Sequence, residues 1–126
     1  MEITKADWKL FRERVPDWQE RYMDKLEKEY IKYLESDEAA STKWWGLREK
    51  IHDDYNCPGV RLDLIKRNVD SDLVRLIMWG VITEDDLDGF SGELTDMVEN
   101  SVDCLNKSES QIRKICNRNI KLNYKN

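Results

Sequence analysis

The chain has 126 residues, which is enough for one domain with a single hydrophobic core. Charged residues make up 37% of the sequence and hydrophobic residues 40%, with a formal net charge of −5, a balance typical of helical globular proteins. The sequence lacks both an apolar run of the roughly 18 residues that a membrane span needs and the apolar core of a signal peptide. Composition thus excludes an integral membrane protein and predicts a cytoplasmic one.

The first third of the chain carries a stripe of large apolar residues at steps of three and four. The stripe consists of Trp8, Phe11, Val15, Trp18, Tyr22, Leu26, Tyr30 and Tyr33. This spacing places all eight side chains on one face of an α-helix, which Thr4 is suited to cap. Because Pro16 lacks an N–H and its ring clashes with the preceding turn, we predict a short helix to about residue 14 and a long one over residues 16–36. The stripe keeps its phase across Pro16, so the two pieces are expected to form one kinked helix.

The next predicted helix covers residues 41–55, after a short polar connection. One side of it is lined by Trp44, Leu47, Arg48 and Ile51. The sequence Cys57-Pro58-Gly59 that follows is the strongest break in the chain. We therefore predict a single helical domain over residues 1–126 with an internal seam near residues 57–59.

The back half of the chain is mostly aliphatic and contains several helix caps. Further helices are expected over residues 60–68 and 72–79, and after Thr83, Ser91 and Ser108. Gly80 stands where a helix-terminating glycine in the left-handed conformation is favoured. Residues 120–124 alternate like a strand but have no partner strand, so a tail is expected there. The fold class is therefore predicted to be all-α, a small bundle of five to seven helices.

Residues suited to catalysis or metal binding are sparse. Three cysteines without CxxC spacing indicate neither a disulfide framework nor a zinc site, and His52 is the only histidine. The acidic run before Gly89 matches part of an EF-hand loop, but Thr95 stands where the loop needs a bidentate glutamate. Motifs for nucleotide binding and hydrolysis are missing from the sequence. We therefore predict a protein that is not an enzyme, with no catalytic residue, cofactor, metal ion or small-molecule substrate.

Charge is distributed unevenly along the chain. Residues 1–75 are nearly balanced, residues 76–106 contain eight acidic and no basic residues, and residues 107–126 contain six basic residues and one acidic residue. The acidic block, defined as Glu84, Asp85, Asp86 and Asp88, either pairs with the basic C-terminal tail or faces a partner. Direct nucleic-acid binding through the tail over residues 107–126 is disfavoured, because a net-negative domain is repelled by a polyanion.

The aromatic residues are the other candidate binding surface. Aromatic side chains at helical spacing usually pack in a core, but those that stay exposed suit a dimer contact or a protein partner. The candidates are Trp18, Tyr22, Tyr30, Trp44 and Trp45. The adjacent pair Trp44 and Trp45 is the most informative, because neighbouring residues on a helix point about 100° apart and both are buried only by contacts on two sides.

Two segments resemble known groups of proteins. Residues 79–87, WGVITEDDL, look like part of the helical hairpin of short helical domains such as SHOCT, a resemblance that spans about residues 73–90 and implies no activity. The front segment, ITKADWKLFR over residues 3–12 and WQERYM over residues 18–23, is similar to small uncharacterised helical proteins of gut Firmicutes. Some of these bacterial proteins carry the label "multidrug transporter", which the sequence contradicts because it has no membrane span. The resemblance supplies no site residues.

The sequence therefore predicts a small acidic helical protein that acts by binding a protein, either a partner or a second copy of itself. One alternative is an inhibitor from a phage or mobile element that blocks a nucleic-acid-handling defence complex, similar to anti-CRISPR proteins, with the acidic block mimicking DNA phosphates. A further alternative is a nucleic-acid binder that uses the basic tail.

Overall fold

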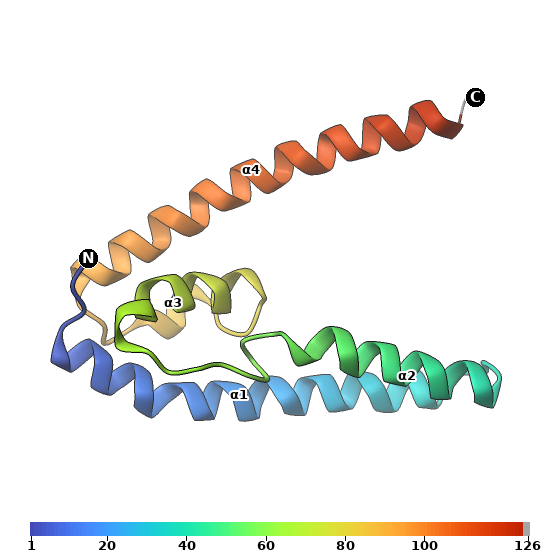
Figure 1. Cartoon of the computed structure of the whole chain (residues 1–126), viewed down its shortest axis with the longest axis horizontal. Coiled ribbons are helices and arrows are strands. Elements are labelled where there is room, and N and C mark those ends of the chain that lie inside the picture. Colours follow the sequence, from blue (N-terminus) through green and yellow to red (C-terminus); the bar gives the residue numbers. More distant parts are fainter. Residues whose placement is uncertain (125–126) are drawn as a thin grey trace.

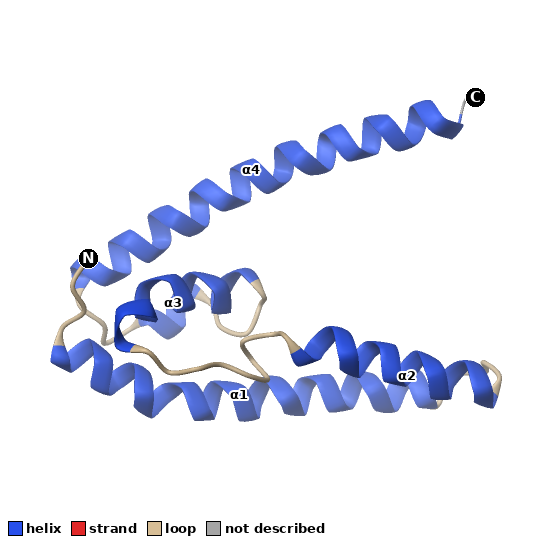
Figure 2. Ribbon diagram, in the orientation of Figure 1, coloured by secondary structure: helices blue, strands red, loops and turns tan. Residues whose placement is uncertain are grey.

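The computed structural model describes the backbone of residues 1–124 and the side chains of residues 1–108. The described chain forms four α-helices, which are α1 (Lys5–Leu34), α2 (Ala40–Tyr55), α3 (Val69–Met78) and α4 (Gly92–Tyr124). Two short 3-10 turns, η1 (Lys66–Asn68) and η2 (Glu84–Leu87), complete the elements. Figure 2 shows helices and connecting loops only, so the prediction of an all-α fold is confirmed.

The predicted number of five to seven helices is wrong for the described residues, which contain four. Residues 60–65 form an extended connection that ends in η1, in place of the expected helix over residues 60–68. The two helices expected after Ser91 and Ser108 are one continuous helix, α4, because Ser108 lies inside it. The strand-like alternation at residues 120–124 also belongs to α4, whose side chains beyond residue 108 lie outside the described ones.

Helix α1 is one helix of 30 residues, which confirms the predicted long N-terminal helix, and it continues through Pro16 without the expected break between residues 14 and 16. Thr4 caps it, since its Oγ1 accepts a hydrogen bond from the N–H of Asp7 at 3.1 Å. Pro16 lies on the exposed side of the helix, as does Arg12, whose carbonyl loses its hydrogen bond to the proline nitrogen. Because that carbonyl is on the solvent side, water can satisfy it, and the buried face of α1 continues through the proline.

The hydrophobic core lies at one end of the molecule, between the first half of α1, helix α3, the loop around η2 and the first half of α4 (Figure 1). Its largest fully buried side chains include Phe11, Leu73, Leu76 and Leu94. Helices α3 and α4 pack directly on each other. The second half of α1 extends beyond this core and is accompanied only by α2 (Figure 1).

The turn at Cys57, Pro58 and Gly59 is buried against the middle of α1. Gln19 donates a hydrogen bond from its Nε2 to the carbonyl of Pro58 at 3.1 Å. A Cβ atom at Gly59 would lie 2.4 Å from the Tyr22 ring, so only glycine allows the loop to approach this closely. The seam predicted from the sequence is thus the place where the chain leaves α2 and turns back over α1.

Three of the predicted helix-end signals of the back half are confirmed, at Gly80, Thr83 and Ser91, whereas Ser108 lies inside α4 and starts no helix. Gly80 ends α3 with a φ of 77°, and the Val81 N–H donates to the carbonyl of Leu76 at 2.9 Å, as in a Schellman motif. The N–H of Thr83 donates to the Asp86 carboxylate at 2.9 Å at the start of η2. Ser91 caps α4 through a weak hydrogen bond to its Oγ from Leu94.

Candidate functional site

The second half of α1 and the whole of α2 form an antiparallel helical hairpin, which we call the arm (Figure 1). The face of α2 that meets α1 is largely polar. Lys43 donates from its Nζ to the carbonyls of Leu34 at 2.9 Å and Ser36 at 3.1 Å, and Gly46 receives the side chain of Tyr33. Because polar contacts hold α2 on α1, its apolar stripe lies to the side of these contacts and stays partly open to solvent.

This stripe is the apolar face, which we define as Trp44, Leu47, Ile51 and Tyr55. Steps of three and four place these residues on one side of α2. Trp44 is 70% exposed, and both Ile51 and Tyr55 are about half exposed, at 51% and 52%. Every residue of α2 is at least partly exposed to solvent. An amphipathic helix normally buries this stripe, and large exposed apolar patches mark protein-interaction surfaces.

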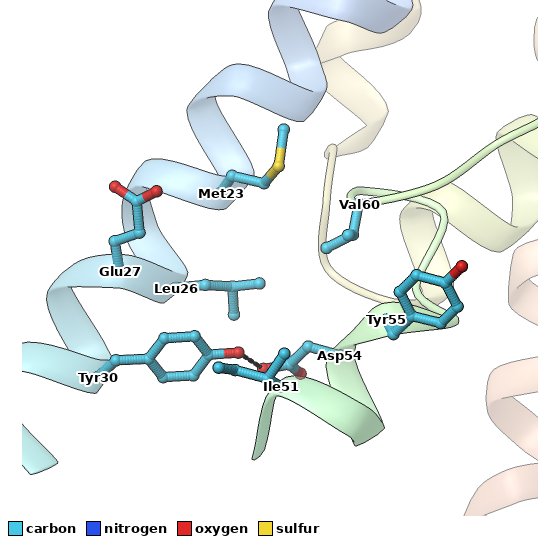
Figure 3. Close-up of a pocket in the computed structure, with 8 residues that line it drawn as sticks. All are labelled: Met23, Leu26, Glu27, Tyr30, Ile51, Asp54, Tyr55 and Val60. Carbon is cyan, nitrogen blue, oxygen red and sulfur yellow. Dashed lines mark hydrogen bonds between the residues drawn. The ribbon is translucent and has the colours of Figure 1, made fainter. Parts of the chain in front are cut away.

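A pocket of about 190 Å³ lies between the base of α2 and α1. It is lined by Met23, Leu26, Glu27, Tyr30, Ile51, Asp54, Tyr55 and Val60 (Figure 3). Its wall includes a hydrogen bond from the Tyr30 hydroxyl to the Asp54 carboxylate (Figure 3). Burial, assisted by that carboxylate, raises the pKa of Tyr30, so the phenol stays protonated as a donor at physiological pH. The pocket is an apolar hollow with two acidic groups, Glu27 and Asp54, beside it.

A second, shallower hollow of about 310 Å³ lies toward the tip of the arm. Trp44, Leu47, Arg48 and Ile51 line it. Ile51 therefore belongs to both hollows and joins them into one continuous apolar surface. The guanidinium of Arg48 lies 5.9 Å from the ring centroid of Trp45, so the second tryptophan is partly covered by a cation. The apolar face thus has acidic groups near its base and a basic group near its tip.

The five aromatic residues singled out in the sequence fall into three environments. Trp18 is only 5% exposed and belongs to the core, because it lies in the half of α1 that faces the buried 57–59 turn. Tyr22 and Tyr30 are half-buried, and burial beside the Cys57 thiol raises the pKa of Tyr22 to about 12. Trp44 and Trp45 are both exposed, so the aromatic surface lies on α2 and not along the stripe of α1.

The acidic block is engaged by arginines of α1. The guanidinium of Arg21 lies 3.2 Å from the carboxylate of Asp86, and Arg14 donates to the backbone carbonyls of Asp86 and Asp88. Glu84 and Asp85 are exposed. The predicted pairing of the block with the basic tail involves side chains after residue 108, which lie outside the described ones.

The contacts of Asp86 also set its protonation. Burial alone would raise the pKa of this carboxyl, but the Thr83 N–H and the Arg21 guanidinium outweigh burial and lower it. A carboxyl with a lowered pKa stabilises the folded state above its unfolded-state pKa, and that contribution is lost as the pH falls through the folded-state pKa.

Asp7, in the first turn of α1, is a buried carboxylate. Its two oxygens accept hydrogen bonds from the Ser91 N–H at 2.9 Å and the Ser91 hydroxyl at 2.6 Å. These bonds tie the start of α1 to the N-cap of α4. A sequence signal did exist, because Asp7 lies four residues before Phe11 and therefore in register with the buried stripe.

Asp72 in α3 is a second buried carboxylate, with one oxygen 3.7 Å from Arg75 and the other without a hydrogen-bond partner among the described groups. Burial raises the pKa of this carboxyl. The charged form of Asp72 therefore destabilises the folded state. This destabilisation grows as the pH rises above the unfolded-state pKa, and it levels off above the folded-state pKa.

We expect Asp72→Asn to melt at the same temperature as the wild type near pH 3 and at a higher temperature at pH 7. Thermal denaturation of both proteins across this range measures it, and a variant that melts lower at pH 7 would contradict it.

Comparison of the chain with protein-family models, with curated proteins and with solved structures finds no match. Among the described residues, the helices all fall short of the length and apolarity required to cross a membrane. The function must therefore be argued from the surface of the chain itself, and the apolar face of the arm is its most distinctive part.

Proposed function

We propose that this chain acts without catalysis, by binding a protein through the apolar face of the arm. The single observation that carries the proposal is the 70% exposure of Trp44, on a helix whose apolar stripe also leaves Ile51 and Tyr55 about half exposed. Tryptophan is the residue most enriched at the energetic centres of protein interfaces. Exposing it at the tip of a hairpin costs solvation free energy that a partner would recover.

The surroundings of Trp44 also suit a protein partner. The face is continuous from the tip to the pocket at the base, because Ile51 lines both hollows. Arg48 and Glu27 flank the apolar residues with charges, and interfaces typically combine an apolar centre with such a polar rim. The arm is also held by side-chain hydrogen bonds to backbone carbonyls, which fix its two helices before any partner binds.

The acidic block is the weaker candidate surface. Arg14 and Arg21 neutralise part of its charge and fix Asp86 in place, which reduces its value as a mimic of exposed phosphates. An inhibitor that uses this block, and nucleic-acid binding by the basic tail, stay predictions of the sequence. Reversing Glu84 and Asp85 is the direct test of the block.

The proposal is tested with full-length Trp44→Ala used as bait in the native host, alongside wild type. Trp79→Ala is the matched control, because Trp79 is another exposed tryptophan, at the end of α3 and away from the arm. We expect Trp44→Ala to weaken capture of the identified partner about 30-fold, equal to about 2 kcal/mol, and Trp79→Ala to leave it unchanged.

Circular dichroism and thermal melting establish that both tryptophan variants are folded. A partner whose binding survives Trp44→Ala, or is lost equally in Trp79→Ala, would contradict the proposal. If binding of the partner is lost only when the charges of Glu84 and Asp85 are reversed, the binding surface is the acidic block and not the apolar face.

A further inference from the structure

We infer that the apolar face seats a second copy of this chain, with the two α2 helices antiparallel about a two-fold axis at Ile51. The inference rests on the proposed function, since it uses the same face and names its occupant. The inference follows from the self-complementarity of the face, a property that a surface for an unrelated partner does not need. The half of the face near the base complements the half near the tip, both in shape and in charge.

The complementarity in shape involves Trp44 and the pocket. In an antiparallel pair of helices centred on residue 51, residues at equal distances on either side of it lie opposite each other, so Leu47 faces Tyr55 of the second copy. Trp44 lies seven residues from the axis, about 10 Å along the helix, and therefore reaches the end of the other α2. There the pocket is open between Met23 and Val60.

The size of the pocket agrees with an aromatic occupant. Its volume is about 190 Å³, whereas an apolar cavity of about 150 Å³ in another protein is known to accept benzene. Its walls are mainly aliphatic and aromatic side chains, as an indole ring requires. Two copies related by a two-fold axis make this insertion twice, once in each direction, because such an interface uses the same patch on both subunits.

The charged residues of the face are also complementary about the two-fold axis at Ile51. Arg48 lies three residues before Ile51 and Asp54 three residues after it, so each Arg48 faces Asp54 of the second copy across the axis. Glu27 lines the same pocket as Asp54, from α1, and adds a second negative charge to the base of the face. Within one copy the two ends of the face carry opposite charge, with Arg48 on the hollow at the tip and the two acids at the base. Pairing of two arms gives a bundle of four helices, the usual way in which helical hairpins bury such faces.

The inference is tested by sedimentation equilibrium of the full chain with two charge reversals, Arg48→Glu and Glu27→Arg. We expect the wild type to form dimers as the concentration rises. Each variant alone places like charges together at two points and should dimerise at least about tenfold more weakly. An equimolar mixture of the two variants restores the attraction between positions 27 and 48 at both ends of the interface, so it should dimerise more strongly than either variant alone.

Lys32→Glu is the control, because Lys32 lies two residues from Tyr30 and so about 200° around α1, on the side away from the pocket. It should dimerise as the wild type does. A wild type that stays monomeric at every concentration overturns the inference, and so does a dimer that neither reversal weakens. Neither result removes the proposed function, which fails separately if capture of a host partner survives Trp44→Ala.

Discussion

Replacing Phe11 by alanine is expected to lower the free energy of unfolding by about 3–5 kcal/mol, the usual cost of removing a fully buried phenylalanine ring. Phe11 is completely buried on α1, within the cluster formed with α3 and α4. Its loss leaves a cavity in the core that α1 shares with α3 and α4. Urea denaturation followed by circular dichroism measures the change.

The control for Phe11→Ala is Ile31→Ala on the same helix. Ile31 is 54% exposed on the part of α1 that belongs to the arm, so its replacement should change stability by no more than about 0.5 kcal/mol. Equal losses from the two variants would contradict the division of α1 into a core half and an arm half.

Replacing Asp7 by alanine is expected to cost about 3 kcal/mol. The change removes the carboxylate that accepts two hydrogen bonds, so the N–H and the hydroxyl of Ser91 lose their acceptor. Because Asp7 joins α1 to the start of α4, amide hydrogen exchange should also become faster in the first turn of α4 than elsewhere.

Asp17→Ala is the matched control for Asp7→Ala, since Asp17 is an exposed aspartate of the same helix. We expect it to change the free energy of unfolding by less than about 0.5 kcal/mol. A loss below about 1 kcal/mol for Asp7→Ala would show that the bonds to Ser91 contribute little to the fold.

Local features of the fold were predictable because they depend on residues close in sequence. The periodicity of apolar residues gave the helical class, Thr4 and Ser91 act as caps, and Gly80 takes the left-handed conformation that its position requires. The long N-terminal helix was predicted as one kinked helix with a break near Pro16, and in the structure it runs without that break from Lys5 to Leu34. Pro16 faces solvent, and the packing of Val15 and Trp18 holds the helix together across it.

The candidate site could be predicted only in part. The stripe has the same spacing at Phe11 and at Tyr30, yet one residue is buried and the other lies on the arm, because burial depends on what packs against each half. The adjacent pair Trp44 and Trp45 did indicate a surface, since a single neighbouring helix cannot cover both. The pocket was not predictable, because it is formed by residues of α1 and α2 that are about 30 positions apart in the sequence.

The mass of the full chain in solution tests the central claim, that the apolar face of the arm binds a second copy, most directly. Sedimentation equilibrium of wild type, Trp44→Ala and Trp79→Ala over the same concentrations measures it. The account predicts dimers for the wild type and Trp79→Ala, and monomers for Trp44→Ala at concentrations where the wild type is mostly dimeric. Dimers of equal stability in all three proteins, or monomers in all three, would contradict it.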